Sequence, residues 1–223
     1  MAFDESLQAR ITNSGAAAVL TIDDAANGVP LARALLDGGV DCMELTLRTP
    51  SALEALHEIK SKVPEMIAGV GTILTVDQVK QTIDAGAEFG VSPGLNRNIV
   101  DAAIRWGLPF APGAATPSEI EAAIELGCRL IKFFPAEPSG GLPYLESAAA
   151  PYDHLGIRYI PLGGVHPGNA ESYLSHRLIA AIGGSFIATR KLIQDQDWKG
   201  IAENAKLARR LVDSARGGQQ SAV

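Results

Sequence analysis

The sequence is poor in aromatic residues, poor in charge and has no excess of basic residues. Aromatics make up 5% and charged residues 20% of its 223 positions, and the net charge is −6. With so few aromatics, the core must rest on Ala, Val, Ile and Leu, which suits a parallel sheet buried on both faces. The negative charge argues against a nucleic-acid partner, because binding a phosphate backbone needs clustered Lys and Arg. A hydrophobic content of 47% indicates a folded domain with a real core.

Cysteine is nearly absent, and long apolar segments are missing. Cys42 and Cys128 are far apart and form no CxxC pattern, so we expect two buried thiols in a reducing cytosol. The N-terminal segment carries acidic residues early and has no basic region followed by an apolar stretch, so no signal peptide is predicted. No apolar run reaches the roughly 18 residues of a membrane span. We therefore expect no membrane-spanning segment.

Short apolar segments recur along the chain and alternate with amphipathic, helix-like segments. Eight are present: 16–22, 42–47, 66–72, 89–92, 109–111, 130–134, 158–162 and 179–182. Strict alternation implies parallel strands joined by right-handed crossovers. Eight such units predict an α/β fold, a single-domain (β/α)8 TIM barrel over residues 16–214. An open doubly wound sheet is the alternative, but no GxGxxG follows the first strand.

The flanking segments and one helix start are also predictable. Residues 1–15 are predicted to form an extra N-terminal helix, residues 198–214 a closing helix, and residues 215–223 a flexible tail. Thr116, Pro117 and Glu119 have the pattern of a helix N-terminus, with a capping threonine, a proline at the first position and a glutamate at the third.

Lys132 lies within the apolar sixth segment, flanked by Ile131 and Phe133. Reactive residues of a (β/α)8 barrel sit at the C-terminal ends of the strands. Lysine is rarely buried without a partner, and burial disfavours its charged form. A neutral amine attacks a ketone, so Lys132 is a candidate Schiff-base nucleophile. The alternative is a structural lysine that pairs with Glu44 or reaches outward to solvent.

Glu44 lies in the second apolar segment, and a carboxylate in such a place is either paired or a proton carrier. At adjacent positions in a barrel, Glu44 and a neutral Lys132 can exchange a proton. A buried structural ion pair is the alternative. Arg48 follows at the strand mouth, where its guanidinium suits a carboxylate, and Thr72 ends the third segment with a hydroxyl. A rim ion pair for Arg48 and simple packing for Thr72 are the alternatives.

Two glycine pairs follow the seventh and eighth segments, at Gly163-Gly164 and Gly183-Gly184-Ser185. The loops after these two strands often bind phosphate through backbone N–H groups, although turn geometry alone also explains glycine. The four histidines, His57, His154, His166 and His176, show no metal-ligand spacing, so we expect them on the surface or in loops.

These residues together resemble the 2-keto-3-deoxy-6-phosphogluconate (KDPG) and 4-hydroxy-2-oxoglutarate (KHG) aldolases, from about Ala18 to Leu211. The segments that carry the resemblance are Gly38-Gly39-Val40, Glu44-Leu45-Thr46-Leu47-Arg48, Gly69-Val70-Gly71-Thr72, Ser92-Pro93-Gly94, Pro112-Gly113, Lys132-Phe133-Phe134-Pro135-Ala136-Glu137, Gly163-Gly164 and Gly183-Gly184-Ser185.

The resemblance implies a class I aldolase in which Lys132 forms the Schiff base and Glu44 shuttles protons. It implies that four residues surround the pyruvyl carboxylate: Arg48, Thr72, Pro93 and Phe134. It implies that four others hold the distal phosphate: Gly163, Gly164, Gly184 and Ser185. It further implies a small 2-keto acid substrate, no metal or cofactor, a homotrimer and a cytoplasmic location.

Leu162 departs from the family pattern, in which the member acting on KDPG usually has threonine before the first glycine pair. Leucine makes no hydrogen bond to a substrate hydroxyl, so the preference at C4 is left open. The expected reaction is reversible cleavage of KDPG to pyruvate and glyceraldehyde 3-phosphate. Its galactonate-derived epimer, and 4-hydroxy-2-oxoglutarate yielding pyruvate and glyoxylate, are alternatives. A phosphosugar isomerase or decarboxylase barrel, and a barrel that binds a metabolite without turnover, are alternatives of other classes.

Overall fold

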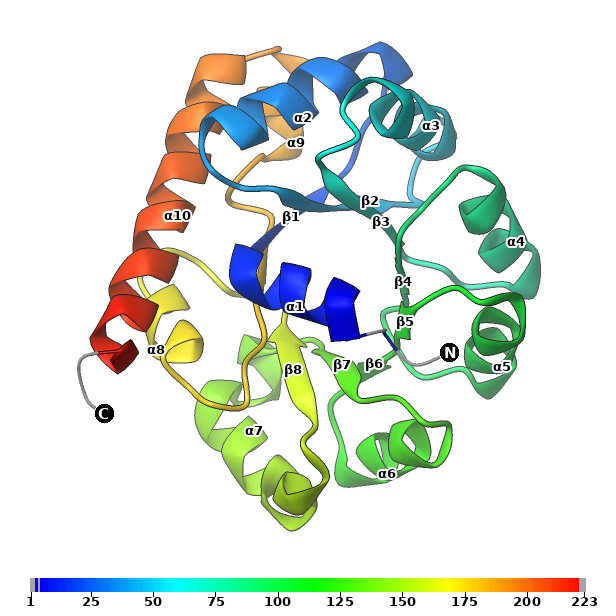
Figure 1. Ribbon diagram of the computed structural model, residues 1–223, viewed down its shortest axis with the longest axis vertical. Helices are drawn as coiled ribbons and strands as arrows, with labels where there is room; N and C mark the ends of the chain where they lie inside the picture. Colours follow the sequence, from blue (N-terminus) through cyan, green and yellow to red (C-terminus); the bar gives the residue numbers. More distant parts are fainter. Residues whose placement is uncertain (1–2, 4, 221–223) are drawn as a thin grey trace.

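The computed structural model describes residue 3 and residues 5–220. Its parallel strands form a ring surrounded by helices (Figure 1). The strands are β1 (Ala16–Leu20), β2 (Cys42–Thr46), β3 (Ile67–Gly71), β4 (Gly90–Val91), β5 (Phe110–Ala111), β6 (Gly113–Ala114), β7 (Leu130–Phe133), β8 (Arg158–Pro161) and β9 (Ile182–Gly184). They pair in the orders β5-β4-β3-β2-β1-β9 and β6-β7-β8.

The ring closes at two places where strands are interrupted. Pro112 separates β5 from β6, so one barrel strand pairs with β4 on one side and with β7 on the other. Proline has no N–H for a ladder, but its carbonyl still accepts from the Lys132 amide at 3.0 Å. On the far side, Tyr159 of β8 bridges Ile179. The predicted (β/α)8 barrel is therefore confirmed.

The helices lie outside the ring, except for α1, which crosses one end of it (Figure 1). They are α1 (Glu5–Ser14), α2 (Gly28–Asp37), α3 (Ala52–Lys62), α4 (Val76–Asp84), α5 (Arg97–Trp106), α6 (Pro117–Glu125), α7 (Gly141–Ala149), α8 (Ala170–Leu174), α9 (Arg190–Gln194) and α10 (Trp198–Gln220), with 3-10 turns η1 (Ala25–Asn27), η2 (Glu137–Ser139) and η3 (Ala150–Leu155). The predicted cap before α6 is confirmed, because Thr116 and Glu119 form a capping box. No helix in the described part of the chain is long and apolar enough to cross a membrane.

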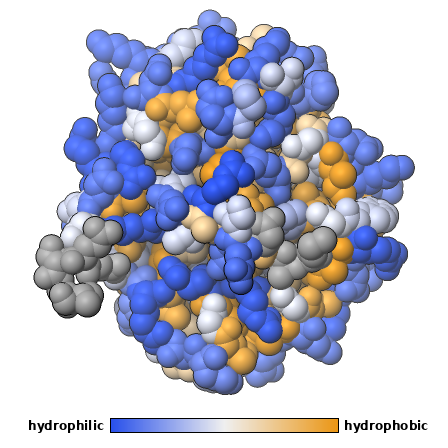
Figure 2. Space-filling model, in the orientation of Figure 1, coloured by the Kyte–Doolittle hydropathy of each residue, from blue (hydrophilic) through white to orange (hydrophobic). Residues whose placement is uncertain are grey.

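The N-terminal helix α1 covers the end of the barrel where the strands begin. Phe3, Leu7 and Ile11 pack into one buried cluster with residues from the first positions of the strands, including Cys42 and Leu130. Figure 2 shows this face with hydrophilic side chains around the rim and apolar surface in patches between the helices. The barrel interior is thereby closed to solvent at this end, and the opposite end is left for a site.

Two predicted boundaries differ from the structure. The eighth strand, expected over residues 179–182, is β9 at Ile182–Gly184, because its glycines pair with β1 and Ile179 only bridges Tyr159. Helix α10 continues to Gln220, beyond the predicted end at Ser214. Tertiary contacts hold this extra turn: the Arg216 guanidinium donates to the Ala180 carbonyl at 2.7 Å and to the Thr12 carbonyl. Residues 221–223 of the predicted tail lie outside the described residues.

Candidate active site

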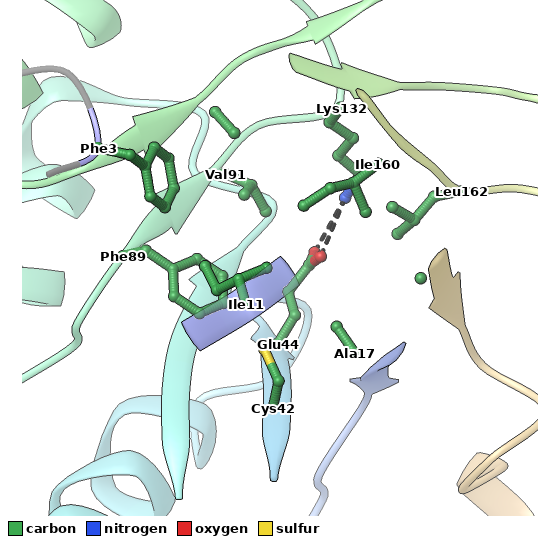
Figure 3. Close-up of a pocket in the computed structure, with 12 residues that line it drawn as sticks. Phe3, Ile11, Ala17, Cys42, Glu44, Phe89, Val91, Lys132, Ile160 and Leu162 are labelled. Carbon is green, nitrogen blue, oxygen red and sulfur yellow. Dashed lines mark hydrogen bonds and ion pairs between the residues drawn. The ribbon is translucent and has the colours of Figure 1, made fainter. Parts of the chain in front are cut away.

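Lys132 and Glu44 meet inside the barrel. Their side chains are 7% and 5% exposed, and Lys132 Nζ lies 2.9 Å from Glu44 Oε1 and 3.3 Å from Oε2. The strands that carry them, β7 and β2, are not hydrogen-bonded neighbours, so the pair meets across the interior rather than along an adjacent pair of strands. Figure 3 shows the two side chains pointing toward one another. A buried ion pair at hydrogen-bond distance allows direct proton transfer between amine and carboxylate.

Space lies on both sides of this pair. On the α1 side is a closed apolar cavity, lined by Phe3, Ile11, Cys42 and Phe89 among others (Figure 3). Burial raises the pKa of the Cys42 thiol, so this group stays protonated at neutral pH. Both cysteines are free and buried, as predicted.

On the other side of the pair is a pocket that opens to solvent at the ends of the strands. It is lined by Val19, Glu44, Arg48, Thr72, Pro93, Lys132, Phe134, Leu162, Gly163, Gly164, Val165, Gly183 and Ser185. Every predicted catalytic, substrate-binding or phosphate-binding residue therefore lines this pocket except Gly184. Gly183 lines the pocket instead. A Cβ built on Gly184 would point at the ring of Phe186.

Arg48 and Thr72 stand near the pocket mouth. Arg48 is exposed, and in the described part of the chain no acidic side chain forms an ion pair with it. Its guanidinium is therefore free to bind an anionic ligand, and the rim ion pair considered from the sequence is not formed. Thr72 has a φ of +61°, a conformation that residues other than glycine rarely adopt, and strain of this kind gathers at functional sites.

Two strand glycines make room for the pocket side chains, a role that the sequence did not reveal. A Cβ on Gly71 would lie 1.8 Å from Glu44 Oε1, so only glycine leaves the carboxylate in place. A Cβ on Gly183 would lie 2.3 Å from Leu162 Cγ. Leu162 is buried against Gly183 and lines both the pocket and the cavity beneath it.

The Gly163–Gly164 loop is held from outside the pocket. The carbonyls of Leu162 and Gly163 accept hydrogen bonds from the amides of Ala136 and Glu137 at 2.7 and 2.9 Å. Both glycines have φ near +90°, which L side chains rarely adopt. The loop thus has a fixed backbone beside the mouth, as an anion-binding loop requires.

None of the four histidines lines this pocket. His57, His154 and His166 are exposed and His176 is partly buried beside Glu146. Among the residues described, no group of three or more His, Cys, Asp or Glu is arranged to hold a metal ion.

The site combines a buried amine, a carboxylate in contact with it and an unpaired guanidinium above, on a barrel whose opposite end is sealed. Such an arrangement belongs to enzymes that form an imine with a keto acid, and the fold and site define a lysine-dependent aldolase, a carbon–carbon lyase. Residues 7–204 match the family described as KDPG and KHG aldolase. The chain belongs to the KDPG and KHG aldolase family.

Individual relatives agree with this assignment. A 2-dehydro-3-deoxy-phosphogluconate aldolase of Treponema pallidum is 41% identical over 82% of this chain and 86% of its own length. A structure of the Legionella pneumophila KDPG aldolase, holding pyruvate as a covalent carbinolamine, has a TM-score of 0.86 at 32% identity, covering 90% of this chain and 97% of that one. The Zymomonas mobilis KDPG aldolase with 3-phosphoglycerate has a TM-score of 0.83 at 37% identity, covering 91% and 94%. Family membership sets aside the isomerase, decarboxylase and non-catalytic alternatives.

Proposed function

We propose that this chain cleaves a 2-keto-3-deoxy-6-phospho sugar acid of the KDPG type, reversibly, to pyruvate and glyceraldehyde 3-phosphate through a Schiff base on Lys132. The observation that carries the proposal is the contact between Lys132 Nζ and Glu44 Oε1 at 2.9 Å, buried at the base of an open pocket. No other lysine lines this pocket among the residues described.

The first step needs a neutral amine. Glu44 accepts a proton from the Lys132 ammonium directly, and the free amine attacks the C2 ketone of the substrate. Glu44 then returns the proton to the carbinolamine oxygen, which leaves as water and produces an iminium ion. Because the two groups exchange one proton at close range, they titrate as a pair.

The iminium ion then accepts the electrons of the C3–C4 bond. Glu44, a carboxylate again after the loss of water, takes the C4 hydroxyl proton, so that the bond breaks, the aldehyde leaves and an enamine remains on Lys132. Glu44 protonates C3 of the enamine, and hydrolysis of the resulting imine releases pyruvate and restores the amine. The protein supplies position and proton transfer in every step, and no metal or cofactor takes part in the proposed sequence.

Residues at the pocket mouth are proposed to bind the two charged ends of the substrate. Arg48 is placed for a bidentate contact with the pyruvyl carboxylate, with Thr72 beside it. The N–H groups of the Gly163–Gly164 loop and of Ser185 are proposed to hold the distal phosphate. The pyruvate held as a carbinolamine by the Legionella pneumophila relative and the 3-phosphoglycerate held by the Zymomonas mobilis relative support a substrate with a pyruvyl end and a phosphorylated end.

Leu162 bears on the identity of the substrate. Its apolar side chain lies in the pocket wall near Lys132 and gives no hydrogen bond to a substrate hydroxyl. The C4 epimer of KDPG and 4-hydroxy-2-oxoglutarate are therefore kept as alternative substrates. The proposal includes assembly as a homotrimer in the cytoplasm, as the family resemblance implies.

The test is a coupled assay of pyruvate release with KDPG, its C4 epimer and 4-hydroxy-2-oxoglutarate offered separately. The proposal expects the highest kcat/KM with KDPG and release of glyceraldehyde 3-phosphate in equal amount. A preference for the epimer or for the unphosphorylated acid would change the proposed substrate but would leave the proposed Schiff-base reaction intact. Release of pyruvate from none of the three would refute the proposed function.

A further inference from the structure

The three peptide carbonyls of Leu162, Gly163 and Gly164 are all occupied by protein donors. The carbonyls of Leu162 and Gly163 accept from the backbone amides of Ala136 and Glu137 in the loop after β7, and the Gly164 carbonyl accepts from Asn169 Nδ2 at 3.1 Å. In a trans peptide, a carbonyl and the N–H of the following residue point in opposite directions. The N–H groups of Gly163, Gly164 and Val165 are thus turned away from these partners, and all three residues line the pocket.

These three N–H groups are also free. In the described part of the chain, none of them donates to another protein group, whereas the next amide, His166 N–H, donates to Asn169 Oδ1 at 2.8 Å. Free, convergent amides form a concave anion site. One side chain, Asn169, therefore grips both ends of the Gly164–His166 segment, through its amide nitrogen and its amide oxygen.

Asn169 differs from the other supports of the loop because it is a side chain. The Leu162 and Gly163 carbonyls are held by main-chain amides, which no substitution removes. The segment also packs on Glu137: a Cβ on Gly164 would lie 2.5 Å from Glu137 Cβ, and Glu137 accepts a 2.5 Å hydrogen bond from the buried Tyr173 hydroxyl. The backbone around Gly164 is therefore fixed from below, and Asn169 sets the plane of the Gly164–Val165 peptide.

We propose that Asn169 is a positioning residue, which orients the Gly164–Val165 peptide so that the Val165 N–H binds the distal phosphate of the substrate. The inference deepens the proposed function and rests on it for the identity of the phosphorylated ligand. Asn169 does not line the pocket and touches no reacting atom. Its effect should therefore fall on the phosphate end of the substrate.

The experiment compares Asn169→Ala with wild type in two measurements. Steady-state kinetics are recorded with KDPG and with 4-hydroxy-2-oxoglutarate, which has no phosphate, and the Kd of inorganic phosphate is measured by calorimetry. We expect KM for KDPG and the Kd of phosphate to rise about tenfold, because a hydrogen bond to a charged group is weakened. The kcat and KM for 4-hydroxy-2-oxoglutarate should stay within about twofold of the wild-type values.

Two further variants control for folding. Asn169→Asp keeps the oxygen that accepts from His166 and replaces the amide donor, so it should fold and show the same selective loss or a larger one. Asn98→Ala changes an exposed asparagine on α5, away from the pocket, and should leave all constants unchanged.

The outcomes separate this inference from the proposed function. An equal loss with both substrates, or no change in phosphate affinity, would overturn the role of Asn169. A wild-type protein that binds no phosphate would overturn it as well. If wild type binds phosphate and Asn169→Ala weakens it tenfold, the positioning role holds even where no pyruvate is released, and only the proposed function fails.

Discussion

The substitution Gly71→Ala tests whether the position of the Glu44 carboxylate controls the chemistry. Gly71 is the last residue of β3, is buried, and has a φ that alanine adopts without strain. Its added methyl group would meet Glu44 Oε1 at 1.8 Å, whereas real Cβ atoms essentially never approach another heavy atom closer than 3.0 Å. The carboxylate must therefore retreat by more than an ångström, away from its 2.9 Å contact with Lys132.

The size of the effect follows from that displacement. A misplacement of about 1 Å costs on the order of 100-fold in rate, so kcat/KM should fall about 100-fold. The rate at which pyruvate forms an imine should fall in parallel, because Glu44 takes the lysine proton in that step. Crowding should also lower the free energy of unfolding by about 1–3 kcal/mol. Each kcal/mol lost should lower Tm by about 2–4 °C.

Imine formation is measured as the rate of borohydride-trapped pyruvate, alongside steady-state kinetics and a thermal melt. Gly217→Ala is the matched control, because a Cβ at Gly217 meets nothing within 4 Å and should leave the rates unchanged. A folded Gly71→Ala protein with wild-type kcat/KM would refute the reasoning, since it would show that the carboxylate need not occupy its observed place.

Three other substitutions probe the mouth, the wall and the base of the barrel. Arg48→Lys removes the planar fork and should lower kcat/KM about 10- to 100-fold with phosphorylated and unphosphorylated substrates alike; a loss with only one would contradict carboxylate binding. Leu162→Thr introduces a hydroxyl and should shift the ratio of kcat/KM for the two C4 epimers at least several-fold, measured by pyruvate release; an unchanged ratio would remove Leu162 from substrate discrimination. Burial of Glu88 opposes ionisation, but hydrogen bonds from Lys60 and Arg10 outweigh it and hold the pKa of Glu88 below its usual value. A lowered pKa stabilises the fold above the unfolded-state value, so Glu88→Gln should cost roughly 1 kcal/mol at pH 7, and denaturant titrations should show the difference closing as pH falls below about 4; a constant difference would contradict the assignment.

The barrel was predictable because its signals are local. Each strand is a short apolar segment and each helix an amphipathic one, and the alternation fixes a parallel fold without knowledge of any contact. Lys132 and Glu44 were recognisable for a related reason, since a charged residue inside an apolar strand is rare. Position along the strands then placed them in the barrel interior.

What escaped prediction depends on contacts between distant segments. Gly71 looked like part of a motif, and its clash with Glu44 appears only when β2 and β3 are paired. The sequence also did not show whether Gly183 or Gly184 of β9 lines the pocket, because glycine carries no side chain whose polarity would mark the inner face. Asn169 stood in a polar loop without a distinguishing pattern, and its role rests on two hydrogen bonds made after folding. The pairing of Pro112 at the split strand is of the same kind.

The central claim is that Lys132 is the amine that forms the imine. The most direct measurement is mass spectrometry of the protein after incubation with pyruvate and borohydride, with peptide mapping of the modified residue. The account predicts one reduced pyruvyl group per chain, on Lys132, and none in a folded Lys132→Ala variant. Absence of the adduct from folded wild-type protein, or its presence on another lysine while Lys132 stays unmodified, would contradict the account.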